Sequence, residues 1–247
     1  MTLRLLTYNI RRGGTGREDA LIEVIRACNA DIVIMQEATN PAVLERLCVG
    51  TGMRTLGSRP RESLGFMSRV PIVHHEWHRP RASRHAFLEI VPQGDPVRLF
   101  GVHLSAVHAA WTEKQRVIEL RALLKSIEKH QHGFHLLAGD FNTLAPGELL
   151  DIRKLPHRLR ALVWLSGGRI RWKTIQVVLN ANYVDVFRSL NGADPGFTFP
   201  TWAPHIRLDY TFAPAGALHR ITHCLVVHHP RTKEASDHAP LLAEFVV

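Results

Sequence analysis

The sequence predicts an α/β protein in which strands outnumber helices and polar residues follow the ends of buried strands. The clearest example lies at 136–143, where an apolar run ends at a glycine. Asp140 and Asn142 follow directly. Loops at strand ends often carry functional groups, although Gly, Asp and Asn are also ordinary turn formers. Four other stretches, spread along the chain, repeat the pattern of an apolar run with a polar residue at its tip.

The composition is that of a folded globular domain with a basic net charge. Of the 247 residues, 45% are hydrophobic and 21% are charged, which excludes a disordered chain. This length supports one large core, and we predict a single domain over 1–247. Lys and Arg number 31 against 22 Asp and Glu, a net charge of +9. The excess favours polyanionic partners such as nucleic acid or an anionic lipid surface.

The cysteines and the apolar runs bear on the cellular location. Cys28, Cys48 and Cys224 are odd in number and lack a C-x-x-C spacing, which argues against a disulfide framework or a zinc site. Free thiols are typical of reducing compartments. The first residues enter a strand-like run directly and no run of 18 apolar residues occurs, so we expect neither a signal peptide nor a transmembrane helix. We therefore expect a cytoplasmic protein.

The N-terminal part is expected to form two buried strands joined by a helix. Residues 3–8 form an apolar run that ends at Asn9 and leads into a basic, glycine-rich loop. Apolar residues with helical spacing predict a helix over 21–28. The stretch 31–37 has a continuous apolar centre, as a strand buried on both faces requires. Glu37 stands at its tip, either as a solvated strand cap or as a metal ligand.

The middle of the chain is expected to form mainly antiparallel strands. A short helix is plausible at 41–47, before several strands divided by Gly, Pro and Arg turns. These strands are expected at 53–56, 64–68, 72–78 and 87–91. The run 98–105 predicts a further strand with His103 at its polar end. Alone, His103 is either a satisfied core histidine or a functional one.

The clearest helix of the chain follows that strand. Its apolar stripe consists of Val117, Leu120, Leu123, Leu124 and Ile127. Its opposite, charged face consists of Glu113, Lys114, Glu119, Arg121, Lys125 and Glu128. This amphipathic pattern predicts a scaffold helix with the charged face toward solvent.

The segment 153–173 combines basic residues with tryptophans around the pair Gly167-Gly168. Such a combination suits a phosphate backbone or a membrane interface. The other interpretation is a pair of amphipathic helices whose apolar side belongs to the core, and the sequence leaves both open.

The C-terminal part contributes further polar residues beside apolar runs. A strand is expected at 206–212 with Asp209 in its apolar centre, where a charge needs a partner. A strand is also expected at 218–227. The last strand is expected to open at 236–242, where Asp237 and His238 are adjacent.

The polar residues at the strand ends share one chemistry, because they offer oxygen or imidazole groups and no thiol. They are Asn9, Glu37, His103, Asp140, Asn142, Asp209, Asp237 and His238. Carboxylate and carboxamide oxygens suit a hard cation, Mg²⁺ or Mn²⁺. Histidines then remain for phosphate contacts and proton transfer. Together these groups predict phosphoester hydrolysis.

Six short motifs in sequence order resemble those of the endonuclease/exonuclease/phosphatase superfamily, which includes deoxyribonuclease-I-like and exonuclease-III-like enzymes and neutral sphingomyelinases. The motifs are Thr7-Tyr8-Asn9, Ile34-Met35-Gln36-Glu37, Val102-His103-Leu104, Gly139-Asp140-Phe141-Asn142, Arg207-Leu208-Asp209-Tyr210 and Ser236-Asp237-His238-Ala239-Pro240. They span nearly the whole chain. The resemblance implies a deoxyribonuclease-I-like, four-layer α/β/β/α sandwich of two mainly antiparallel sheets.

The resemblance also implies a magnesium site. Glu37 would be the main Mg²⁺ ligand, with Asn9 beside it and Asp237 near the metal. Arg84, which precedes the strand expected at 87–91, would contact a substrate phosphate. Mn²⁺ is the alternative metal.

The resemblance further implies roles in proton transfer and phosphate binding. His238 would act at the scissile phosphate, oriented by Asp209, which explains a carboxylate within an apolar strand. Asp140 would orient or activate the attacking water. Asn142 and His103 would hold the phosphoryl oxygens as charge develops.

Three functions follow from these residues. The first is a Mg²⁺-dependent phosphodiesterase acting on nucleic acid, favoured by the basic charge. The second is a phosphodiesterase or phosphatase for a phosphorylated small molecule or an anionic lipid head group, of phospholipid, phosphoinositide or sphingomyelin type. The third is a catalytically inactive binding module, which the complete set of site residues argues against. The segment 102–108 differs from the Tyr- and Asn-rich segment of abasic-site endonucleases, which argues against repair of abasic sites.

Overall fold

The computed structural model describes most of the chain. The described residues are 1–81, 83–94, 97–106, 110–130, 133–148, 153, 157, 160–161, 164 and 172–247. Most of the basic segment 153–173 lies outside this set, so the role predicted for that segment stays a prediction.

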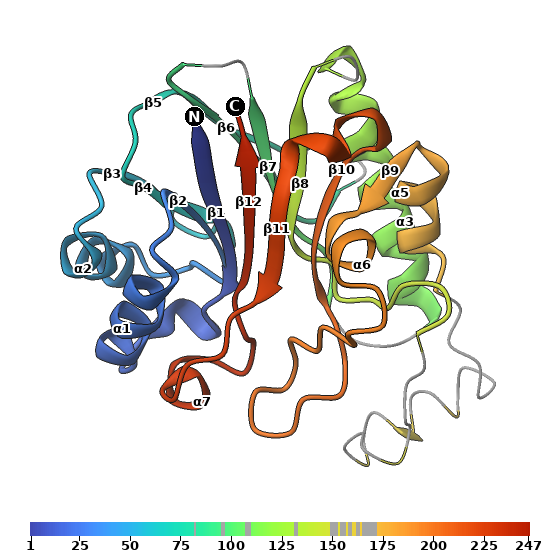
Figure 1. The fold of residues 1–247 in the computed structure, drawn as a ribbon. Helices are drawn as coiled ribbons and strands as arrows, with labels where there is room; N and C mark the ends of the chain where they lie inside the picture. The colour runs from blue at the N-terminus through green and yellow to red at the C-terminus, as the bar shows by residue number, and fades with distance from the viewer. Residues whose placement is uncertain are drawn as a thin grey trace.

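Two six-stranded sheets form the centre of the molecule (Figure 1). The first sheet has the order β11 (Ile221–Val226), β12 (Leu241–Val246), β1 (Thr2–Asn9), β2 (Ile32–Gln36), β4 (Gly65–Ser68) and β3 (Thr55–Gly57). The second has the order β5 (Ile72–His78), β6 (Phe87–Pro92), β7 (Arg98–His103), β8 (His135–Asp140), β10 (Asp209–Pro214) and β9 (Tyr183–Asp185).

Helices cover the outer faces of both sheets (Figure 1). The α-helices are α1 (Glu18–Cys28), α2 (Pro41–Thr51), α3 (Ala110–Ser126), α5 (Thr174–Asn180), α6 (Val186–Asn191) and α7 (Thr232–Ala235). Short 3-10 helices are η1 (Arg12–Gly14), η2 (Glu128–His130) and η4 (Ala215–Arg220). Helices α1 and α2 pack on the first sheet, and α3 and α5 pack on the second.

Three apolar layers separate these elements. Side chains such as Ile34 and Leu136 fill the space between the two sheets. A second layer, which includes Leu21, lies between the first sheet and its helices. A third, which includes Leu120, lies between the second sheet and its helices. The predicted four-layer α/β/β/α sandwich is therefore confirmed.

Each sheet contains one parallel pair at its centre. In the first sheet β1 is parallel to β2, and in the second β7 is parallel to β8. Helices α1 and α3 make the two crossovers. The remaining strand pairs among the described residues are antiparallel, as predicted. All five residues of β2 are buried, which matches its continuous apolar centre.

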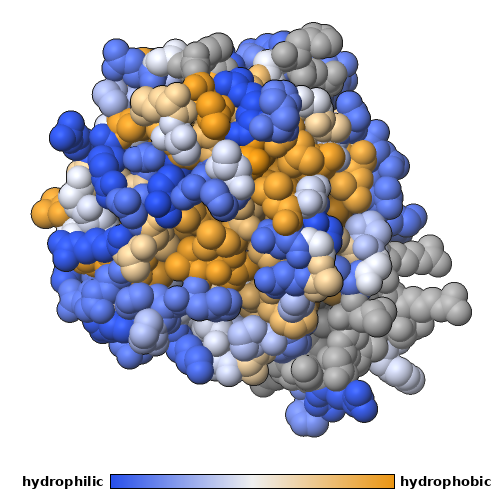
Figure 2. Space-filling model, viewed as in Figure 1, coloured by the Kyte–Doolittle hydropathy of each residue, from blue (hydrophilic) through white to orange (hydrophobic). Residues whose placement is uncertain are grey.

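The edge strand β11 leaves apolar surface beside it. Leu225 on β11 and Leu190 on α6 are each 40% exposed. Figure 2 shows hydrophobic residues toward the middle of this face, between hydrophilic margins.

Among the described residues, no helix combines the length and the apolar character needed to cross a membrane.

The predicted solvent-facing side of α3 is partly wrong. Glu113 and Glu119 are buried, at 5% and 2% exposure. Glu119 accepts hydrogen bonds from the backbone and hydroxyl of Ser105, at 3.1 and 2.9 Å. Glu113 accepts one from the Thr143 hydroxyl at 3.0 Å. Both carboxylates thus anchor loops that follow β7 and β8, which a helical periodicity does not reveal.

The C-terminal strands begin later than predicted. Asp209 is the first residue of β10 and not its centre, because the residues before it pair with a loop. Ile206 makes an isolated bridge with Phe199, and the Leu208 amide donates to the Thr198 hydroxyl at 3.1 Å. Residues 218–220 lie in η4, and the last strand begins at Leu241.

Candidate active site

The predicted site residues meet at one end of the two sheets. Asn9 ends β1 and Glu37 follows β2, while His103 ends β7 and Asp140 ends β8. Because each of these strand pairs is parallel, each pair delivers its polar residues to the same edge. Asp209 begins the antiparallel strand β10 directly opposite Asp140. These strand ends lie at the lower end of the two sheets in Figure 1, so polar residues from both sheets come together there.

Asn9 joins the two sheets at this edge. Its Nδ2 donates to Asp140 Oδ2 at 3.0 Å and to Glu37 Oε1 at 3.3 Å. Its side-chain oxygen Oδ1 accepts from the Arg11 amide at 2.9 Å. Two carboxylates from different sheets therefore converge on one carboxamide.

Asp140 is buried among groups that oppose one another. Its Oδ1 accepts from the Asn142 amide at 2.8 Å. The pKa of Asp140 is raised to about 7, mainly by burial. The positive charge of His238 lowers this pKa, and the negative charge of Asp209 raises it. The Asp140 carboxyl group can therefore gain or lose a proton near neutral pH.

His238 lies between the two aspartates. Its Nδ1 is 2.8 Å from Asp209 Oδ2, and its Nε2 is 3.8 Å from Asp140 Oδ2. Burial opposes a charge on His238, but Asp209 and then Asp140 outweigh burial and raise its pKa to about 10. The ring also packs against Phe199, with centroids 4.9 Å apart. His238 is therefore held as an imidazolium with its Nε2 toward Asp140.

His103 and Asn142 flank this group. Burial, with His85 and His238 as further causes, lowers the pKa of His103 to about 3, so the ring is neutral. Among the described residues its Nδ1 is buried without a hydrogen-bond partner. Asn142 has a positive φ of 53° and donates through Nδ2 to the Leu104 carbonyl at 3.0 Å.

The carboxylates at the end of the first sheet face arginines. Glu37, with a φ of 55°, accepts from the Arg12 amide through Oε2. Asp237 Oδ2 lies 3.2 Å from Arg11 Nε. Arg17 donates to the Ala235 carbonyl at 2.7 Å and so supports the segment before Asp237. The basic, glycine-rich loop after β1 is thus part of the site.

Arg84 lies next to the site and not within its buried part. The Arg84 amide donates to Glu119 Oε1 at 3.3 Å, and the residue is exposed. The next residue, His85, stacks on His103 with ring centroids 5.5 Å apart and an interplanar angle of 25°. His85 was not predicted as a site residue, and its position next to Arg84 is the one sequence signal that pointed to it.

Ser236, which belongs to the last sequence motif, and Thr198 are two further residues that were not predicted as site residues. The Ser236 hydroxyl donates to the Asn9 carbonyl at 2.7 Å and lies 3.3 Å from the His238 amide. The Thr198 hydroxyl accepts from the Asp209 amide at 3.3 Å. Both fix the backbone of the site residues, and hydroxyls of this kind carry no distinctive sequence pattern.

The donor set suits a hard divalent cation. Asp209 Oδ1 is buried without a hydrogen-bond partner among the described residues. Ligand atoms of Asp140, Asp209 and His238 lie within 4.8 Å of one another, but the imidazolium form of His238 does not bind a metal, so the oxygens are the candidate ligands. Glu37 and Asp140 share one donor, the Asn9 amide. Carboxylate oxygens in excess over donors are what Mg²⁺ or Mn²⁺ requires.

Comparison with known structures supports the fold. An AP endonuclease from Archaeoglobus fulgidus has 18% identity and a TM-score of 0.72, with 99% of this chain and 100% of that chain covered. The 3' phosphatase NExo from Neisseria, bound to a product DNA hairpin, has 17% identity, a TM-score of 0.72 and the same coverage. TDP2 from D. rerio with a single strand DNA product has 18% identity, a TM-score of 0.68, and coverage of 100% and 99%.

The sequence was also compared with known families and curated proteins. A search of curated proteins found no match. The model of the Endonuclease/Exonuclease/phosphatase family matches residues 6–238. This span contains the site from Asn9 to His238. The chain therefore belongs to the Endonuclease/Exonuclease/phosphatase family, a family of phosphoester hydrolases.

Proposed function

We propose that the protein is a divalent-metal-dependent phosphodiesterase with nucleic acid as its favoured substrate. The observation that carries this proposal is the position of His238, whose ring lies between Asp209 and Asp140. Asn9 links Asp140 to Glu37 at the same place. Proton-transfer groups and candidate metal ligands therefore adjoin each other, as metal-assisted phosphoester hydrolysis needs.

The metal ligands in this proposal are Glu37, Asn9 and Asp237, and Mg²⁺ or Mn²⁺ is the cation that their oxygens favour. A bound cation would polarise a phosphoryl oxygen and offset negative charge on the leaving group. Arg11 and Arg12 border these ligands. They would bind phosphate groups on either side of the scissile bond.

Asp140 and His238 have different roles in proton transfer in this proposal. Asp140, with a pKa near neutrality, would take a proton from the attacking water, since a base works best when its pKa lies near the working pH. His238 would present its Nε2 proton to a phosphoryl oxygen. Asp209 holds the ring through Nδ1, so only Nε2 faces the substrate. The positive charge on His238 would then offset the charge that builds on the phosphate.

Asn142 and His103 would complete the contacts to the phosphate. Asn142 Nδ2 carries two hydrogens and uses one for the Leu104 carbonyl, so the second remains for a phosphoryl oxygen. The neutral ring of His103 would donate or accept without adding charge. Arg84 would contact a more distant phosphate from its exposed position.

Nucleic acid is favoured on two grounds. The net charge of +9 raises the local concentration of a polyanion. Two proteins of similar fold, NExo from Neisseria and TDP2 from D. rerio, are described with product DNA. The sequence identities of 17% and 18% carry the fold alone, so the substrate is part of the proposal.

A matched panel of substrates tests the proposal. The panel is single-stranded DNA, duplex DNA, RNA, sphingomyelin, phosphoinositides and a bis-aryl phosphodiester, each with Mg²⁺, Mn²⁺ or chelator. We expect metal-dependent cleavage of a nucleic acid that both Glu37→Gln and His238→Ala abolish. The control is His223→Ala, which removes an exposed histidine of β11 that pairs with Glu244 of β12. Cleavage of a lipid alone would move the proposal to a lipid head group, and no cleavage by folded, metal-binding protein would favour a binding module.

A further inference from the structure

The two catalytic aspartates of the proposed mechanism repel each other across a strand pair. Asp140 on β8 and Asp209 on β10 are directly opposite in the antiparallel register, and each is 1% exposed. Like charges at opposed positions destabilise strand pairing. His238 offsets part of this repulsion from one side. On its other side, the loop after Asp140 is attached to residues that flank Asp209.

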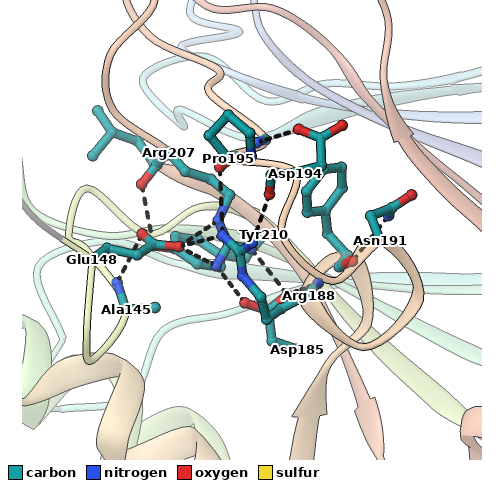
Figure 3. A network of polar contacts seen from close by, with 12 residues as sticks. Ala145, Glu148, Asp185, Arg188, Asn191, Asp194, Pro195, Arg207 and Tyr210 are labelled. Atoms are coloured by element: carbon teal, nitrogen blue, oxygen red, sulfur yellow. Dashed lines mark hydrogen bonds and ion pairs between the residues drawn. The ribbon is translucent and has the colours of Figure 1, made fainter.

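Arg207 provides such an attachment two residues before Asp209 (Figure 3). Its side chain is 1% exposed, and its Nε and Nη2 donate to Glu148 Oε1 at 2.9 and 2.6 Å. Its Nη1 donates to Asp185 Oδ1 at 3.0 Å. Glu148 lies on the loop that begins at Asp140, whereas Asp185 lies on β9. The guanidinium thus joins the loop to the two strands β9 and β10.

Tyr210 makes the second attachment, on the other side of Asp209. Its hydroxyl lies 3.0 Å from the Thr143 carbonyl and 3.4 Å from Glu148 Oε2. The guanidinium of Arg207 lies over its ring, 4.4 Å from the centroid. Burial raises the pKa of Tyr210 well above its ordinary value, so the hydroxyl keeps its proton and remains a donor. Thr143 directly follows Asn142, so this contact reaches the site.

We propose that Glu148, Arg207 and Tyr210, here called the loop clamp, are positioning residues that hold the loop of Asp140 and Asn142 against Asp209. This inference rests on the proposed function for its effect on catalysis. Its structural part, the attachment of the loop, stands on the contacts above.

Part of this loop lies beside a hollow. A hollow of about 720 Å³ borders the loop clamp. Among its described lining residues are Leu144, Ala145, Phe197 and Ile206, together with Glu148 and Arg207. The hollow lies beside residues 144–148, where polar contacts from the loop clamp add to the packing of the buried residues Phe141 to Ala145.

The charges of the loop clamp are balanced, so it acts through position. Glu148 and Asp185 together offset Arg207 and Arg188, whose Nη2 also lies 3.1 Å from Glu148 Oε1 (Figure 3). Buried ion pairs of this kind add little net stability over apolar residues of equal volume. What the fork of a guanidinium adds is a fixed direction for two partners at once.

Kinetics and hydrogen exchange on the whole protein test the inference. Tyr210→Phe removes one donor and keeps the shape of the core, and Glu148→Gln removes the charge and keeps the size. Arg207→Lys keeps the charge but loses the fork. The matched control is Glu89→Gln, which alters a buried carboxylate of β6 that pairs with His78 at 2.7 Å, away from the loop.

We expect the three clamp variants to lower kcat by about 10- to 100-fold with little change in KM, because a displacement of about 1 Å at a reacting group costs this much. Exchange should quicken at the amides of Phe141 and Ala145, which bond to Leu208 and Glu148, and not in β1 or β2. Glu89→Gln should change neither.

Clamp variants with the wild-type kcat would overturn the inference, whatever their exchange rates. Rescue of kcat by Arg207→Lys would also overturn it, because charge and not direction would then suffice. If the wild-type protein hydrolyses no substrate, the proposed function fails by itself. Exchange at Phe141 and Ala145 would then still decide whether the loop clamp holds the loop, and unchanged exchange would overturn that part too.

Discussion

The two sheets contribute carboxylates of different kinds to one site. At the end of the first sheet, Asp237 has a side chain that is 19% exposed and faces Arg11, and Glu37 is half-buried. At the end of the second, Asp140 and Asp209 are each 1% exposed and face His238. The same chemical group is thus placed near solvent and arginines in one sheet and near an imidazole in the other. Among these four carboxylates, burial separates the candidate metal ligands Glu37 and Asp237 from Asp140 and Asp209.

His238 makes the two halves depend on each other. It precedes β12 of the first sheet, yet its hydrogen bond goes to Asp209 of the second. Asn9 makes the reciprocal link, from β1 of the first sheet to Asp140 of the second. A change at either residue should therefore affect groups in both sheets.

The largest expected effect separates proton transfer from metal binding. His238→Ala should lower kcat by about 10²- to 10⁴-fold, the usual contribution of a positioned acid or base, and leave Mn²⁺ affinity intact. Glu37→Gln should weaken Mn²⁺ binding itself. Steady-state kinetics and titration calorimetry check the pair. Equal loss of Mn²⁺ affinity in both variants would contradict a division of roles between the sheets.

A close approach within the second sheet gives the next largest effect. Gly139 is paired with Val102, and a Cβ at Gly139 would lie 1.9 Å from the Val102 carbonyl oxygen. Gly139→Ala should therefore lower the free energy of unfolding by about 3 kcal/mol or more, the upper part of the range for overpacking. In the first sheet, the corresponding position is Met35, paired with Tyr8.

Chemical denaturation of Gly139→Ala checks this expectation. Its control is Gly52→Ala, at a φ of 70° where a Cβ would have no neighbour within 4 Å. That control carries the cost of a positive φ alone, about 1–2 kcal/mol. An equal loss in both variants would mean that the close approach of β7 and β8 is not what requires glycine.

The pH dependence of stability tests the buried half directly. With the metal chelated, the pKa of His238 is raised from 6.5 to about 10 by Asp209 and Asp140 acting against burial. A raised pKa binds protons more tightly in the folded state, so this stabilisation is complete below pH 6.5 and is lost as pH rises through about 10. The free energy of unfolding should fall across that window, and fall less in His238→Gln. Parallel curves for the two proteins would contradict the ion pair.

The smallest expected effect lies at the arginines of the first sheet. Arg11→Ala removes the partner of Asp237 and should raise Mn²⁺ affinity about two- to fivefold, as expected for loss of a partly exposed ion pair of ~0.5–1 kcal/mol. Calorimetry against Arg46→Ala, whose partner is Glu18, provides the comparison. A weaker Mn²⁺ affinity would mean that Arg11 supports the ligands and does not compete for them.

The sequence predicted the residues of the site better than their partners. Asn9, Glu37, His103 and Asp140 stood out because each follows an apolar run, and parallel pairing then brings strand ends together. The family resemblance implied that Asp209 orients His238. Local patterns suffice where a strand end fixes the position of its side chain.

The contacts that support the site could not be predicted from local sequence patterns. Arg207 pairs with Glu148 across 59 residues, and no periodicity signals such a pair. Glu113 matched a solvent-facing helix position, but its two oxygens are taken by Thr143 and Thr174. Sequence spacing reports which face of an element is apolar, and it does not report which charged residues are used inside.

The first sheet combines strands from both ends of the described chain, because the last strand, β12, lies between β1 and β11. The Ser236 hydroxyl reaches the Asn9 carbonyl across 227 residues. During translation, β1 is therefore synthesised long before His238. A nascent chain that ends before residue 238 lacks the imidazole at the end of β1. With the role proposed for His238, we expect this phosphoester hydrolase to become active only after β12 has docked.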